Sequence, residues 1–159
     1  MNQKVRVVFG ILIAIWIIVV FCFSHQPADQ SSKTSQQAIQ VIVDVLKLEE
    51  SMSEDELKNL ITNLKIPIRK MAHFAMYFVG GILICLFFAT INRFSTKQKI
   101  LLSQCVATGY AVSDEVHQAF VPGRGPQLLD IGIDSVGAFI GIMLVILLIY
   151  LYRRKKECK

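Results

Sequence analysis

The sequence predicts an all-α, polytopic membrane protein: a four-transmembrane-helix bundle with short amphipathic helices in the first outer loop. Two observations predict this class. Of the 159 residues, 53% are hydrophobic and only 18% are charged, a balance typical of membrane proteins. In addition, four long apolar segments alternate with polar stretches that carry most of the positive charges. At this length we expect a single domain over residues 1–159.

The first span covers about residues 5–23 and is long enough to cross the roughly 30 Å hydrocarbon core of a bilayer. It follows positive charges, as a signal peptide does. Its apolar stretch is longer, however, and no small-residue cleavage site follows, so we expect a retained helix. The second and fourth spans cover about residues 71–91 and 128–152. The third, about 100–118, contains Ser103, Gln104 and Thr108, so neighbouring helices should shield it from lipid.

Residues 24–70 form a long outer loop in which we expect two short amphipathic helices. Apolar residues recur there at helical spacing in two sets: Ile39, Ile42, Val43 and Leu46, and then Leu57, Leu60, Ile61 and Leu64. Ser53 and Glu56 have the spacing of a capping box, which predicts the start of the second helix. The helices should join near residues 50–52, and the second should end at Pro67. They could pack over the bundle, act as a lid or anchor the chain at the lipid surface.

Positive charges beside the spans predict the orientation. They gather in three segments, which share one side of the membrane only if there are four spans: residues 4–6, 93–99 and 153–159. The positive-inside rule makes that side cytoplasmic. We therefore expect a multi-pass protein with both termini in the cytoplasm and with residues 24–70 and 119–127 on the extracytoplasmic side.

Neither the net charge nor the cysteines indicate another class of protein. A net charge of +5 is compatible with nucleic-acid binding, but these charges cluster beside apolar segments. We ascribe them to membrane orientation and expect no nucleic-acid partner. The cysteines show no paired spacing, so we expect small hydrophobic side chains rather than disulfides or metal ligands. They are Cys22, Cys85, Cys105 and Cys158.

Every predicted span carries polar side chains at its outer end. Because successive spans run in opposite directions, these side chains should meet at one depth. The spacings i, i+3 and i+7 place Lys70, His73 and Tyr77 on one stripe of the second span. Asp130 and Asp134 lie one turn apart on the fourth span. We therefore expect a polar pocket, shared by the spans, that faces the extracytoplasmic side.

Two glycines, Gly137 and Gly141, continue the stripe of Asp134 along the fourth span. Small residues four positions apart let a helix approach its neighbour closely, so this stripe should turn toward the bundle. Ionisable groups in a membrane cost about 3 kcal/mol each on insertion scales, which favours an inward, paired arrangement. That pairing could also be purely structural, as a network of salt bridges.

The residue types of this layer suit acid–base chemistry on an anionic substrate. Histidine titrates near neutral pH, and arginine can bind a phosphate through two parallel hydrogen bonds. The candidate catalytic residues are His73, Tyr77, Asp114, Glu115 and His117. The candidate substrate-binding residues are Ser24, Gln26, Arg69, Lys70, Gln118, Arg124, Asp130 and Asp134. The nucleophile stays open among Ser24, Ser113 and water.

Three stretches resemble the VanZ-like family of bacterial membrane proteins: FSHQ at 23–26, RKMAHFAMYFVGG at 69–81 and SDEVHQAFVPGRGPQLLDIGIDSVGAFIG at 113–141. The family is linked to low-level resistance to glycopeptide antibiotics such as teicoplanin. The resemblance therefore implies a location in the bacterial cytoplasmic membrane and a connection with the cell envelope, but no agreed reaction. Family members usually carry a glutamate just before the tyrosine of the second span, where this chain has Met76. Any role of that acid is then absent here, or is supplied elsewhere, for example by Glu115.

Two classes of function fit these features. The chain could be a membrane-embedded hydrolase or transferase acting on a membrane lipid or a lipid-linked cell-wall precursor that enters from the outer leaflet. Carboxylates could then hold a divalent cation such as Mg²⁺ beside the phosphates, whereas zinc is less favoured because no compact motif such as HExxH is present. Alternatively, the pocket binds without catalysis and alters antibiotic access to the cell surface. A transporter is less favoured, because four spans offer no path unless oligomers form, and the oligomeric state is not indicated.

Overall fold

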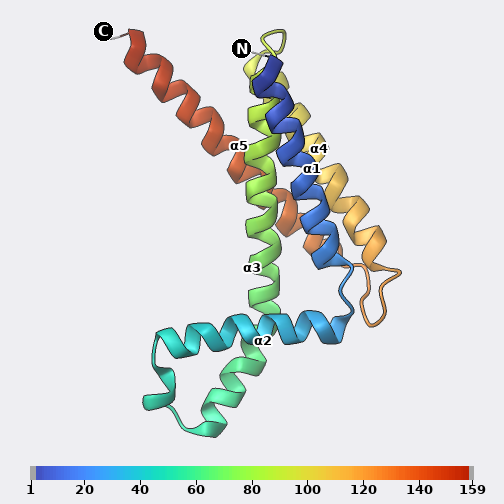
Figure 1. Ribbon diagram of the computed structural model, residues 1–159, viewed down its shortest axis with the longest axis vertical. Helices are drawn as coiled ribbons and strands as arrows, with labels where there is room; N and C mark the ends of the chain where they lie inside the picture. Colours follow the sequence, from blue (N-terminus) through green and yellow to red (C-terminus); the bar gives the residue numbers. More distant parts are fainter. Residues whose placement is uncertain (1–2, 158–159) are drawn as a thin grey trace.

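The computed structural model describes residues 3–157, and within this range the chain is all-helical, as predicted. Its elements are α1 (Gln3–Ser24), α2 (Ala28–Val45), the 3₁₀ turn η1 (Leu48–Glu50), α3 (Glu54–Ala89), α4 (Thr96–Gln118) and α5 (Leu128–Glu157). Helices α1, α3, α4 and α5 run alternately up and down, and α2 lies across one end of them (Figure 1). We call this end, where α1 and α4 finish and α5 begins, the α2 end. The two chain termini lie at the opposite end (Figure 1).

Three helices, α1, α3 and α5, are long and apolar enough to cross a membrane. Only 17% of the most apolar stretch of α1 is buried, and 28% of the corresponding stretches of α3 and α5. Extensive outward-facing apolar surface is typical of helices in contact with lipid, so the chain is a membrane protein. Cys22, Cys85 and Cys105 are free thiols, as expected. Cys158 lies outside the described residues.

The prediction of two amphipathic helices before the second span is only partly correct. The first corresponds to α2, which buries Ile39 and Val43. The second does not end at Pro67, because α3 is a single helix of 36 residues with this proline inside it. A proline removes one backbone hydrogen bond from a helix, yet α3, which packs against both α2 and α5, continues through it. The expected loop helix and the second span are therefore one element.

The start of α3 is fixed by the predicted capping box. The backbone N–H of Glu56 donates to Ser53 Oγ (3.4 Å), and the backbone N–H of Ser53 donates to the Glu56 carboxylate (2.9 Å). The backbone bond from Ser53, and then the bond from its hydroxyl, lower the pKa of Glu56, because both favour the charged carboxylate. The start of α3 is thus determined by the local sequence, Ser53 to Glu56.

Glycines determine how closely α3 and α5 approach, and this is the most extensive helix pair in the bundle. A Cβ atom on Gly137 would lie 2.5 Å from the carbonyl oxygen of Phe74. Cβ atoms on Gly141 and Gly81 would likewise collide with the backbone of the facing helix. The close approach predicted for Gly137 and Gly141 is confirmed. It fixes the first turns of α5 directly against α3.

Replacing Gly141 with alanine should destabilise the bundle, because the new Cβ collides with the α3 backbone. Comparable overpacking costs about 1–3 kcal/mol, so we expect a lower midpoint of thermal unfolding for the detergent-solubilised protein. Gly132→Ala on the same helix is the matched control, because no neighbouring group lies within 4 Å of a Cβ at that position. The higher helix propensity of alanine should keep or raise its midpoint. Equal midpoints for the two variants would contradict the close α3–α5 contact.

Candidate functional site

Polar side chains from three helices of the bundle meet at the α2 end. His73 of α3, Asp114 of α4 and Asp134 of α5 each offer one atom of a metal-ligand type, and these atoms lie within 4.8 Å of one another. Asp114 is 4% exposed and Asp134 is 0% exposed, so the group is shielded from solvent. We call these three residues the carboxylate–histidine cluster.

Asp134 is the least satisfied member of the cluster. Both of its carboxylate oxygens are buried, and neither has a hydrogen-bond partner. His73 Nδ1 lies 3.8 Å from Asp134 Oδ2, which is beyond hydrogen-bonding distance. A buried carboxylate without partners carries a large desolvation penalty. Asp134 therefore needs a proton or a positive charge, and His73, when protonated, supplies one only through a loose ion pair.

Asp114, by contrast, is held by a chain of hydrogen bonds. Ser24 Oγ donates to Asp114 Oδ2 (2.8 Å), and Gln118 Nε2 donates to the same oxygen (3.1 Å). Gln118 Oε1 accepts from Arg124 Nη1 (3.1 Å), which also donates to the carbonyl oxygen of Ser24 (3.3 Å). The chain ties the end of α1, the end of α4 and the 119–127 loop together around one carboxylate.

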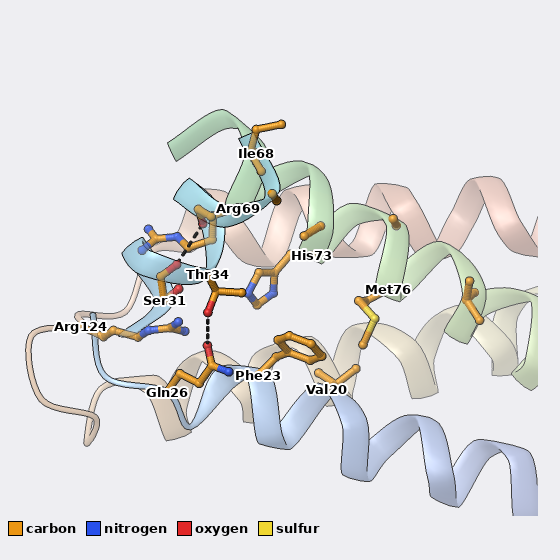
Figure 2. Close-up of a pocket in the computed structure, with 15 residues that line it drawn as sticks. Val20, Phe23, Gln26, Ser31, Thr34, Ile68, Arg69, His73, Met76 and Arg124 are labelled. Carbon is orange, nitrogen blue, oxygen red and sulfur yellow. Dashed lines mark hydrogen bonds between the residues drawn. The ribbon is translucent and has the colours of Figure 1, made fainter. Parts of the chain in front are cut away.

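A cavity of about 340 Å³ adjoins the cluster, between α1, α2, α3 and the 119–127 loop (Figure 2). Its polar end is lined by Arg69, Arg124, Gln26 and Thr34, which lie close together in Figure 2. Thr34 Oγ1 donates to Gln26 Oε1 (3.5 Å). His73 lines the cavity as well, so the cavity and the cluster share a wall.

Apart from Ser31, Ser35 and His73, the rest of the cavity wall is apolar. Val20, Phe23, Met76 and Val79 line it, and the first three lie on the side away from the arginines in Figure 2. Met76 stands where the resemblance to the VanZ-like family implies a glutamate. Glu115 is not among the cavity-lining residues, so this part of the wall keeps its apolar character.

The polar end of the cavity carries an excess of positive charge. Burial lowers the pKa of Arg124, and the positive charge of Arg69 lowers it further. Arginine nevertheless stays protonated at neutral pH. Arg124 Nε is buried and has no hydrogen-bond partner. Two cationic side chains with an unused donor favour an anion at this end.

Three predicted site residues are engaged in contacts next to the cluster. Lys70 forms an ion pair with Asp130, and its ammonium group also donates to the side chain of Gln127 (3.4 Å). Glu115 Oε2 accepts the backbone N–H of Gln127 (2.7 Å). These bonds attach the 119–127 loop and the start of α5 to α3 and α4. The roles in catalysis and substrate binding expected for Glu115, Lys70 and Asp130 remain predictions.

His117 pairs with a residue that the sequence analysis did not include in the site. Its ring packs on Phe21 and His25, with ring centroids 4.7 and 5.3 Å away, and its Nε2 lies 3.2 Å from His25 Nδ1. The signal that could have identified His25 is its position at the outer end of the first span, at the same depth as His117. The two imidazoles form a pair separate from the carboxylate–histidine cluster.

Tyr77 lies one turn from His73 along α3 and is fully buried. Its ring packs edge-on against Trp16, with centroids 5.6 Å apart, and its hydroxyl has no hydrogen-bond partner. Of the two serines considered as nucleophiles, Ser24 contacts Asp114, whereas Ser113 Oγ donates to the carbonyl of Tyr110 in its own helix (2.8 Å). Geometry therefore favours Ser24 over Ser113.

A family model described as VanZ/LLP1 matches residues 9–150. This range includes every residue of the cluster and of the cavity. Searches among curated proteins and among solved structures found no match. The family match covers most of the chain, including the four bundle helices and the site between them, and we conclude that the chain belongs to the VanZ-like family.

Proposed function

We propose that this VanZ-like protein binds the phosphate head group of a membrane lipid, or of a lipid-linked cell-wall precursor, in the cavity at the α2 end. The observation that carries the proposal is the placement of Arg69 and Arg124 at one end of a cavity whose other walls are mostly apolar. Binding takes place on the extracytoplasmic side of the bacterial cytoplasmic membrane. By this route the protein alters tolerance to glycopeptides such as teicoplanin.

The polar end of the cavity supports an anionic rather than a neutral head group. Arg124 is positioned by its bonds to Ser24 and Gln118, which leave its buried Nε without a partner. The nearby charge of Arg69 lowers the pKa of Arg124, so an anion bound between the two arginines would favour their charged forms. Phosphate oxygens match guanidinium donors in charge and geometry.

The apolar walls support a lipid as the carrier of that phosphate. Phe23 and Val79 line the cavity and are each 48% exposed. The cavity is therefore bounded by side chains that would also face the acyl chains of a bilayer. A hydrocarbon tail can pass along this wall while the head group stays with the arginines.

The contacts of α4 support a fourth span, although this helix falls short of the apolar character of the other three. Gln104 Nε2 donates to the carbonyl of Ser135 (3.1 Å), and Thr108 Oγ1 donates to Ser135 Oγ (3.2 Å). Ser103 is buried. The polar groups of α4 thus face α5 rather than lipid, which is what a membrane-crossing helix requires. With four spans, all three basic segments lie on one side, which the positive-inside rule makes cytoplasmic.

Single cysteines at the two ends of α4 should react from opposite sides of the membrane. In a background without native cysteines, Gly125→Cys should be labelled in intact cells by a membrane-impermeant maleimide. Lys97→Cys should be labelled only after permeabilisation, because it lies in a basic cytoplasmic segment. A membrane-permeant maleimide should label both and serves as the control. Labelling of both positions from the same side would exclude α4 as a span.

Arg69→Ala and Arg124→Ala should each weaken binding of a polyprenyl phosphate to the purified protein in nanodiscs. Each change removes charge-assisted hydrogen bonds of about 1.5–3 kcal/mol, equivalent to roughly ten- to hundredfold in the dissociation constant. Lys33→Ala is the matched control, because Lys33 is an exposed cation of α2 that does not line the cavity. The corresponding polyprenol, which lacks the phosphate, should bind poorly. Equal binding of alcohol and phosphate would refute a phosphate site.

Asp114→Asn and Arg124→Ala should both lower teicoplanin tolerance in cells where the unmodified protein raises it, provided that immunoblots show normal membrane insertion. Asp114 holds the network that positions Arg124, so both variants disturb the same cavity. Lipid and wall composition, measured in the same cells by mass spectrometry, separates the two classes of function. A product that disappears with Asp114→Asn indicates a hydrolase or transferase, and unchanged composition indicates binding alone. Full tolerance in both variants would contradict the proposal.

A further inference from the structure

We propose that His73, Asp114 and Asp134 bind a divalent transition-metal cation of the Zn²⁺ type. Their three ligand-type atoms come from three different helices and lie within 4.8 Å of one another. Zinc bound to nitrogen and oxygen ligands lies about 2.0–2.2 Å from each, so closing the site needs side-chain adjustments on the order of 1 Å. The proposal goes beyond the lipid site and does not depend on it.

The absence of hydrogen bonds to Asp134 points to a bound cation in addition to its loose ion pair with His73. Both of its oxygens are buried without partners. The neighbouring cation on α3, Lys70, is committed to Asp130. His73 forms a loose ion pair with Asp134 when it is protonated, because its Nδ1 lies 3.8 Å from the carboxylate, too far for a hydrogen bond. An ion placed among the three side chains would supply the interactions that Asp134 lacks.

Asp114 has the support that metal-binding carboxylates usually receive. Ser24 Oγ and Gln118 Nε2 both donate to its Oδ2 (2.8 and 3.1 Å), so the orientation of the carboxylate is fixed before any ion arrives. Such outer hydrogen bonds are typical of metal sites, because they hold the ligand in position. The network also explains why a buried serine and a buried glutamine lie beside this carboxylate.

The composition of the cluster favours a transition metal over magnesium. Mg²⁺ prefers oxygen ligands and retains several waters, whereas an imidazole nitrogen favours zinc and its neighbours. Three protein ligands, with a fourth position left for water or substrate, are the usual arrangement of catalytic zinc. Two carboxylates balance the charge of a divalent ion in a buried site. Since the ligands lie on three helices, no compact sequence motif is expected for this site.

The test uses the metal alone with the full-length protein. Protein in detergent is treated with a chelator, dialysed and titrated with ZnCl₂, while bound metal is measured by mass spectrometry and stability by thermal unfolding. We expect one tightly bound zinc and a higher unfolding midpoint. Asp134→Asn and His73→Ala should weaken zinc binding at least a hundredfold and abolish the zinc-dependent rise. An excess of MgCl₂ should not displace the zinc.

Two controls keep the result interpretable. His25→Ala breaks the His25–His117 pair, another place where zinc could bind, and Asp29→Asn removes an exposed carboxylate at the same end of the bundle. Both variants should bind zinc as the unmodified protein does. Asp134→Asn preserves the shape of the side chain and removes a buried charge, so the metal-free variant should fold. Zinc binding that survives Asp134→Asn and His73→Ala, or that is lost with His25→Ala alone, would overturn the proposal.

Discussion

The backbone contact between α3 and α5 is the constraint on which the polar site depends. Gly137 and Gly141 bring no side chains to this contact, so the two helices touch directly. Asp134 lies one turn before Gly137 and is therefore carried into the bundle interior, beside His73. With a wider spacing between these helices, the Asp134 carboxylate would be less completely shielded from solvent. The unusual electrostatics of the α2 end thus follow from the absence of two Cβ atoms.

Apart from one close ion pair, the charges at the α2 end are separated by sign. Lys70 and Asp130 form an ion pair that helps to hold the start of α5. The positive charges of Arg69 and Arg124 border the cavity, whereas the carboxylates of Asp114 and Asp134 lie in the cluster beyond His73. Arg124 is connected to Asp114 through Gln118 and through Ser24. An anion in the cavity and a cation in the cluster would each relieve one half of this separation, and each would favour the other.

The helices, and the layer in which the polar groups meet, follow from local pattern. The spacing predicted that Asp134 and the glycines lie on one stripe. The basic segments predicted that successive spans run in opposite directions. Other features depend on tertiary packing and were beyond such reasoning. The helix α3 continues through Pro67 and packs against both α2 and α5, although a proline usually ends a helix. Spacing within one helix likewise did not show that His117 would pair with His25 rather than join His73, because the rotation of α4 about its own axis is decided by its neighbours.

Trp16 is the only tryptophan of the chain, and its place in the bundle has a practical consequence. Its ring packs against Gly80, and its Nε1 donates to the carbonyl oxygen of Met76 (2.8 Å), whose side chain lines the cavity. The natural fluorescence of the unlabelled protein therefore originates from a single indole directly behind the cavity wall. Any displacement of α1 relative to α3 alters the surroundings of that indole, so the molecule carries an optical reporter of its own interior.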